Sequence, residues 1–362
     1  LLNFTWWVNR KDLAGKHVFG GGFLGLDNIG VFDRSQPLPT GGHLEQADGT
    51  AWMAFYCATM LSIALELADG DPAYEDIATK FFEHFVAITH AINTLGGTGL
   101  WDEQDGFYYD QIWQDGRAER LRVRSLVGLL PLCAVELIDM RRVERLPGFH
   151  KRMRWFLQNE RELAQHVTFG RVDDAEAALL AVPSRKKVER VLRVLCDEAE
   201  FLSPFGVRSL SHRHRGNPFV LRLNGDEYRV DYTPAESTTS MFGGNSNWRG
   251  PVWLPLNYLL IEALERYGRF YGDSLLVEVP TGSGHRVTLQ QLADELSRRL
   301  TTLFRRGADG NRPFAGEDRR FADDPHYREL LWFHEFFDGE TGRGCGASHQ
   351  TGWTALVARL FG

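Results

Sequence analysis

Apolar residues recur at the spacing of one helix face in two neighbouring stretches near the start of the chain. The spacing predicts one helix over residues 50–67 and a second over 74–92, which stops before Gly96-Gly97. Because the connection between them is short, we expect the two helices to form an antiparallel pair.

More helices are expected further along the chain. Residues 122–138 contain a continuous apolar run, which predicts an inner helix bent at Pro131. A helix that begins at Pro251 and runs to Tyr271 would place Trp248 and Arg249 at its N-terminus. The remaining ranges with helical spacing are 149–164, 186–201, 289–304 and 351–361.

Turn residues divide these helical ranges. Asp-Gly and Asn-Gly steps predict β-hairpins in 99–115 and 219–231, and a third hairpin is expected in 276–287. Residues 1–39 contain too many glycines for a helix interior, so this segment is expected to be a shaped loop that holds two acids, Asp27 and Asp33.

The helices therefore come in pairs, with short hairpins at the junctions between pairs. Apolar inner and polar outer helices are typical of toroids and solenoids, but no fixed repeat period is present, which argues against a regular solenoid. The loops rich in Gly, Asp and Trp resemble the rim of an all-α barrel built from α/α pairs.

Composition narrows the class of partner. A hydrophobic content of 43% supports a sizeable core, and a net charge of -7 with dispersed Lys and Arg argues against nucleic acid as a partner. No apolar run approaches the ~20 residues of a membrane span, and the start lacks a signal-peptide pattern, so we expect a cytoplasmic protein without a membrane. No zinc site or disulfide framework is indicated by the four widely spaced cysteines, Cys57, Cys133, Cys196 and Cys345.

Glu335 is the first candidate for catalysis. It lies among aromatic residues, in the stretch 332–342, and a carboxylate near aromatic walls loses hydration, which suits a general base. The alternative is a solvated residue at a helix end beside the turn at Asp338-Gly339.

Hydrolysis of a glycosidic bond needs a second carboxyl group and benefits from aromatic platforms for the sugar. The chain carries 10 Trp, and several acids lie in aromatic loops. Composition leaves open which two acids form a pair among Asp27, Asp33, Asp102, Glu103, Asp105 and Glu335.

Four ordered motifs resemble those of glycoside hydrolase family 63. They are Gly25-Leu26-Asp27-Asn28 with Arg34, Trp101-Asp102-Glu103-Gln104-Asp105-Gly106-Phe107-Tyr108, Trp248-Arg249-Gly250-Pro251-Val252-Trp253, and Glu335-Phe336-Phe337-Asp338-Gly339-Glu340-Thr341-Gly342. That family includes processing α-glucosidase I, bacterial α-glucosidases and mannosylglycerate hydrolases. The resemblance implies an inverting, exo-acting glycosidase on α-glucosides or related α-glycosides, with Asp27 as general acid and Glu335 as general base.

The resemblance also implies an (α/α)6 toroid-type barrel, which has twelve helices. The pattern yields about eight, so we expect residues 1–362 to be one catalytic domain that is the C-terminal part of a longer protein, incomplete at the N-terminus. Phe4, Trp6 and Trp7 would then form an exposed apolar face, covered by a missing N-terminal segment or by self-association.

The expected ligand is an oligosaccharide or a small glycoside, with no cofactor and no metal. The residues expected to contact it are Phe23, Trp101, Asp102, Glu103, Trp248, Arg249, Gly250, Trp253 and His349. The two tryptophans Trp101 and Trp248 could equally fill the core, and Asp102 and Arg249 could hold loops together. Asp102, Glu103 and Asp105 also form an arrangement that could bind calcium, which ranks below sugar binding.

Two other functions remain as alternatives. One is a catalytically incomplete carbohydrate-binding or scaffold protein on the same barrel, against which the presence of both Asp27 and Glu335 argues. The other is an epimerase or lyase, which would need a histidine pair, and only His334 and His349 are near.

Overall fold

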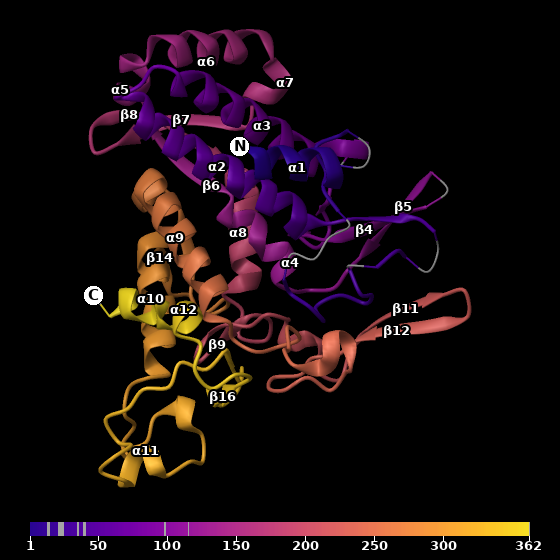
Figure 1. The fold of residues 1–362 in the computed structure, drawn as a ribbon, viewed down its shortest axis with the longest axis vertical. Helices are drawn as coiled ribbons and strands as arrows, with labels where there is room; N and C mark the ends of the chain where they lie inside the picture. The colour runs from indigo at the N-terminus through magenta and orange to yellow at the C-terminus, as the bar shows by residue number, and fades with distance from the viewer. Residues whose placement is uncertain are drawn as a thin grey trace.

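The computed structural model describes residues 1–12, 15–20, 25–34, 36–38, 41–97, 99–114 and 116–361. Long helices make up much of the core, and small antiparallel sheets of two or three strands lie between them (Figure 1). The helices are α1 (Leu2–Lys11), α2 (Ala47–Ala68), α3 (Tyr74–Thr94), α4 (Leu126–Leu129), α5 (Met140–Arg145), α6 (Pro147–Asn159), α7 (Arg161–Ala164), α8 (Arg185–Leu195), α9 (Leu254–Tyr271), α10 (Leu289–Thr302), α11 (Arg320–Asp323) and α12 (Thr351–Thr354).

The strands are short. Two sheets have three strands, in the orders β1-β4-β5 and β6-β8-β7, and the others are two-stranded. The strands are β1 (His43–Glu45), β2 (Trp101–Asp102), β3 (Phe107–Tyr108), β4 (Asp110–Gln114), β5 (Arg117–Leu121), β6 (Val135–Asp139), β7 (Val167–Val172), β8 (Ala175–Ala181), β9 (Leu202–Ser203), β10 (Gly206–Val207), β11 (Phe219–Leu223), β12 (Asp226–Val230), β13 (Leu276–Glu278), β14 (Arg286–Thr288), β15 (Phe336–Phe337) and β16 (Gly344–Cys345).

Two pairs of long helices organise the fold. The helices α2 and α3 pack against each other, as do α9 and α10, which lie together on the left of Figure 1. The inner face of α2 is built from small and branched side chains such as Ala54, Ala58 and Leu61, which are almost fully buried. In α10 a capping box between Thr288 and Gln291 satisfies backbone donors at the helix start. The predicted helix pair 50–67 and 74–92 is therefore confirmed.

By length and composition, α2 would also be long and apolar enough to cross a membrane, although half of the tested stretch is buried inside the fold. The expectation that no run approaches this length was wrong. A core helix of a globular fold meets the same criterion of length and composition, because small apolar residues suit both a protein core and a lipid bilayer.

Several predicted elements differ in the structure. Residues 122–138 do not form one helix: α4 is a single turn, a 3-10 turn follows at Leu130–Cys133, and β6 begins at Val135. β6 pairs with β8 over Val135–Asp139, so the apolar run covers a buried strand as well as a helix end. The start of the chain is not all loop, because α1 is helical, and the expected C-terminal helix is only α12 followed by a 3-10 segment.

Two further expectations need correction. α9 begins at Leu254, so Pro251 and the Trp248-Arg249 pair precede the helix and lie in an irregular segment. In α1, Phe4 is buried and Trp7 is partly buried, whereas Trp6 is half exposed, so only part of the predicted apolar face is open. The predicted hairpins around residues 101–108, 219–230 and 276–288 are confirmed. The helix-rich character is confirmed, the small sheets go beyond an all-α description, and the closed ring stays a prediction.

Candidate active site

The loop that carries Asp27 is fixed to the core by a buried arginine. Arg34 donates to both carboxylate oxygens of Asp48 at the start of α2, and its Nη2 lies 3.2 Å from Asp110 Oδ2. Burial raises the pKa of Asp110 to about 6, against the opposing effect of Arg34. This cluster holds the base of the Asp27 loop against α2 and β4.

Asp27 faces a segment more than two hundred residues away in the chain. Its Oδ2 accepts a hydrogen bond of 2.6 Å from the Ser246 hydroxyl. The next residue, Asn28, donates from Nδ2 to Asn247 Oδ1 at 3.1 Å and accepts at Oδ1 from the Trp248 backbone N–H at 2.7 Å. The Asp27 loop is therefore seated directly on residues 246–253, which we call the tryptophan segment.

Asn247 is the centre of this contact. Its side chain is fully buried and also donates to the carbonyls of Thr233 and Ala235, at 2.8 and 2.7 Å. Its own carbonyl accepts the indole N–H of Trp253 at 2.8 Å. A buried amide with all of these bonds holds one conformation, since any rotation would leave polar atoms unpaired.

An aromatic stack continues from the tryptophan segment toward Glu335. The rings of Trp248 and Trp253 are parallel, with centroids 3.7 Å apart, and Trp253 stacks on Phe336 at 4.7 Å. Val252 and Phe337 exchange two backbone hydrogen bonds, of 2.8 and 3.0 Å. The residue next to Glu335 is thereby fixed to the same segment that holds the Asp27 loop.

Glu335 itself precedes β15 in an irregular segment and is not at the end of a helix. Its backbone N–H donates to the Ala347 carbonyl at 2.9 Å, and its Oε2 accepts the Ala347 N–H at 3.1 Å. Gly346 lies against the carboxylate, and a Cβ there would be 2.7 Å from Glu335 Oε2. The partly buried carboxylate is thus oriented by its own hairpin, residues 335–347, which we call the Glu335 hairpin.

The turn of this hairpin is anchored by a second network. Glu340 Oε1 accepts from the Tyr232 hydroxyl and lies 3.3 Å from Arg208 Nη2. Despite the opposing effect of burial, these partners lower the pKa of Glu340. Asp338 Oδ1 accepts the backbone N–H of Glu340 at 2.7 Å and so shapes the turn. The hairpin is therefore held at both ends.

Four residues that were expected to contact the ligand belong to the tryptophan segment and contact these elements: Trp248, which stacks on Trp253, and Arg249, Gly250 and Trp253. Arg249 donates to the carbonyls of Asn28 and Gly30, so in this structure it holds the Asp27 loop in place. Gly250 has φ +148°, and a Cβ there would meet the Thr233 carbonyl oxygen at 2.6 Å, so only glycine fits. Trp253 is 1% exposed and supports the stack.

The Trp101 hairpin, residues 101–108, has different surroundings. Trp101 is 2% exposed and donates to Glu103, whose carboxylate pairs with Arg190 of α8 at 2.6 Å. Asp102 accepts from Arg122 at 3.1 Å and from two backbone N–H groups of its own turn. Despite the opposing effect of burial, these hydrogen bonds lower the pKa of Asp102. In these contacts Trp101 fills the core, and Asp102 and Glu103 hold the loop in place. Sugar contact by this hairpin stays a prediction.

The other expected ligand contacts are less well placed. Phe23 lies outside the described residues. His349 is exposed, with its ring 5.7 Å from that of Phe333, and its role stays a prediction. Among the described residues, no group of three or more His, Cys, Asp or Glu side chains is placed to hold a metal ion, so Asp102, Glu103 and Asp105 are not such a group.

Sequence reasoning assigned no role to several residues that build this site. Asn28 and Asn247 join the two segments, Ser246 contacts Asp27, and Phe336 extends the stack. Their only signal was adjacency to the motif residues, because a buried amide is not distinguishable from a turn asparagine without its partners.

Comparison with known proteins places this chain in a family. Residues 175–354 match the family model of the mannosylglycerate hydrolase MGH1-like glycoside hydrolase domain. The uncharacterized protein YMR196W of Saccharomyces cerevisiae is 50% identical over 99% of this chain, and the chain spans only 35% of that protein. The mannosyl-oligosaccharide glucosidase of the same yeast is 26% identical over 51% of this chain and 16% of its own length.

A solved structure is also similar. The crystal structure of GH63 mannosylglycerate hydrolase from Thermus thermophilus in complex with glucose superposes with a TM-score of 0.45 at 16% identity, over 89% of this chain and 46% of that chain. The family model covers the tryptophan segment and the Glu335 hairpin. The aromatic stack joins these two elements, and the Asp27 loop contacts the first of them. The chain belongs to glycoside hydrolase family 63.

Proposed function

We propose that this chain hydrolyses α-glucosides from their ends with inversion, using Asp27 as general acid and Glu335 as general base. The observation that carries the proposal is the continuous connection from the Asp27 loop through Asn247, Trp253 and Phe336 to Glu335. A rigid connection of this kind would keep two carboxyl groups in one relative position, which proton transfer requires.

The chemistry follows from the two roles. Asp27 would donate a proton to the leaving glycosidic oxygen, while Glu335 would take a proton from a water molecule that attacks the anomeric carbon from the opposite face. Inversion requires room for that water, so the two carboxyl groups are expected to be roughly 6.5–9.5 Å apart when substrate is bound. The Ser246 hydroxyl, which donates to Asp27, would orient the acid.

The choice of substrate class is supported by the similarity to the mannosyl-oligosaccharide glucosidases of two yeasts. Trp353 offers an aromatic face for the sugar, because it is 38% exposed and its ring lies edge-on to Trp253 at 6.2 Å. We assign Trp353 as the stacking platform in place of the buried Trp248.

The test uses α-glucosyl fluoride and an α-glucosyl disaccharide, with the product anomer read by NMR. Asp27→Asn should abolish turnover of the disaccharide. The loss of turnover on the fluoride should be about 10²-fold smaller, because a good leaving group needs little protonation. Glu335→Gln should abolish both. The matched control is Asp33→Asn, an acid of the same loop, which should keep both activities per folded molecule.

Two results would contradict the proposal. A first-formed product with the α configuration would show retention and exclude the water-activated mechanism. A wild-type chain that binds glucosides without hydrolysing either compound would favour the carbohydrate-binding or scaffold alternative.

A further inference from the structure

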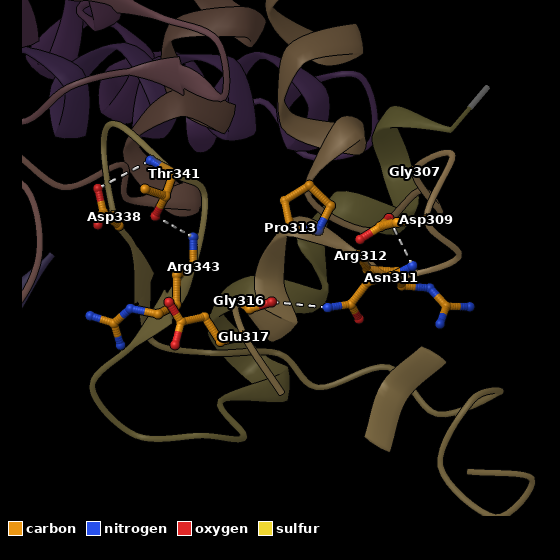
Figure 2. Close-up of a pocket in the computed structure, with 10 residues that line it drawn as sticks. All are labelled: Gly307, Asp309, Asn311, Arg312, Pro313, Gly316, Glu317, Asp338, Thr341 and Arg343. Atoms are coloured by element: carbon orange, nitrogen blue, oxygen red, sulfur yellow. Dashed lines mark hydrogen bonds between the residues drawn. The ribbon is translucent and has the colours of Figure 1, made fainter. Parts of the chain in front are cut away.

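A cavity of about 620 Å³ lies beside the Glu335 hairpin. Figure 2 shows Asp338, Thr341 and Arg343 on one side of it and Asp309, Asn311 and Pro313 on the other, with Gly316 and Glu317 between them. Its volume is in the range of small-molecule sites. Asp338, which shapes the hairpin turn three residues after Glu335, is therefore also part of a cavity wall.

Asn311 carries an unsatisfied acceptor in this cavity. The residue is 6% exposed, and its Nδ2 donates to the Gly316 carbonyl at 2.9 Å, while its Oδ1 has no hydrogen-bond partner among the described residues. The amide cannot be turned over, because Oδ1 would then face the Gly316 carbonyl oxygen. In Figure 2 the side chain points toward Gly316, which also lines the cavity. A buried acceptor left unpaired costs about 1–3 kcal/mol, so this atom indicates a donor on a bound molecule.

The cationic side chains of the wall are already committed. Arg312 donates to the carbonyls of Phe304 and Arg328, at 3.0 and 2.8 Å, and Arg343 pairs with Glu236 at 2.7 Å. Glu317, by contrast, makes no hydrogen bond or ion pair within the described part of the chain. The wall therefore offers acceptors and few donors, which disfavours an anionic ligand and favours one that presents hydroxyl groups.

We propose that this cavity binds one sugar unit, with ligand hydroxyls donating to Asn311 Oδ1 and to the carboxylates of Glu317 and Asp338. The choice of a sugar over other hydroxylated molecules rests on the proposed function. A cation is disfavoured because these residues do not form a metal-binding group among the described residues. Pro313 supplies an apolar surface of the kind that packs against sugar C–H groups.

Binding can be measured without turnover in the Asp27→Asn background. Methyl α-D-glucopyranoside and methyl α-D-mannopyranoside are titrated by calorimetry, and crystals soaked in the tighter ligand locate it. Sugar density between Asn311 and Asp338 is expected. Asn311→Leu and Glu317→Ala should each weaken binding by about tenfold, as expected for loss of one hydrogen bond to a buried or charged acceptor.

Glu317→Ala is the decisive variant, because the exposed Glu317 has no described partner and its loss should leave folding intact. Glu329→Ala, an exposed acid outside the cavity, is the control and should bind as the parent does. Failure of both sugars to bind, unchanged affinity in both cavity variants, or sugar density only elsewhere would overturn the proposal. Calcium that binds here while both sugars do not would also overturn it.

The outcomes separate this proposal from the proposed function. Hydrolysis of α-glucosides by the wild type, with no sugar in the cavity, would remove only the cavity proposal. Sugar binding in the cavity without any hydrolysis would remove only the catalytic one.

Discussion

The Trp101 hairpin and the tryptophan segment look alike in the sequence, since both combine tryptophan with charged residues in loops. In the structure, Trp101 and Trp253 are equally buried, at 2% and 1% exposure. Their partners differ. The Trp101 hairpin is tied to Arg122 and to Arg190 of α8, whereas the tryptophan segment contacts both the Asp27 loop and the Glu335 hairpin.

Burial and composition therefore do not separate a supporting loop from the loop that we propose to be catalytic. What separates them is which acids the loop touches. The partners of Asp102 are positive side chains and its own backbone, which neutralise it. The partner of Asp27 is a neutral hydroxyl, which leaves the carboxyl group available for proton transfer.

The largest expected effect compares the two tryptophans directly. Trp101→Ala and Trp253→Ala should each lower the free energy of unfolding by about 3–5 kcal/mol, since both remove a buried ring. The milder Trp253→Phe should lower turnover per folded molecule at least about tenfold, because the stack on Phe336 shifts Glu335. Trp101→Phe should leave turnover within about twofold. Denaturant titration and initial rates measure both quantities, and equal losses of turnover would erase the distinction.

The second test compares how the stability of the two regions depends on pH. Burial lowers the pKa of His214 to about 4, and its Nε2 accepts the backbone N–H of Arg124 at 3.1 Å, beside the Trp101 hairpin. Because the folded pKa lies below the unfolded value of 6.5, the stabilisation is present above pH 6.5 and is lost as pH falls toward 4. The loss should reach up to about 3 kcal/mol.

His214→Gln should flatten this dependence between pH 6.5 and 4, measured by urea unfolding at several pH values. His166 provides the comparison, since burial also lowers its pKa to about 4 at a site beside His90. Hydrogen exchange should show the Trp101 hairpin opening in acid before the tryptophan segment does. An unchanged slope in His214→Gln would mean that this histidine does not control the response.

The smallest expected effect concerns the anchor of the Glu335 hairpin. Glu340→Gln keeps the shape of the side chain but removes its charge from Arg208 and Tyr232. We expect a loss of about 1 kcal/mol in stability and a drop of about threefold in turnover, with KM nearly constant. Glu227→Gln, which breaks an exposed pair with Arg222, should change neither. A matching loss in Glu227→Gln would indicate a general charge effect.

Elements whose signals are local can be predicted from the amino-acid sequence alone. The α2 and α3 helices follow from apolar spacing over residues 50–67 and 74–92, and the hairpins follow from Asn-Gly and Asp-Gly steps that prefer left-handed backbone. The motifs around Asp27 and Glu335 also indicated the family, because a motif is recognised from its residue types and their order, without knowledge of their contacts.

The secondary structure of residues 122–138 and the contacts at the centre of the site depend on residues that are distant in the sequence. A continuous apolar run suits a buried strand and a buried helix equally, and the choice depends on β8, which pairs with residues 135–139 from some forty positions away. The role of Asn247 depends on distant residues in the same way, since its side chain forms hydrogen bonds with Asn28, Thr233 and Ala235. The physical reason is that strand pairing and buried hydrogen bonds are made between distant residues, whereas helical periodicity and turns are written within a few consecutive ones.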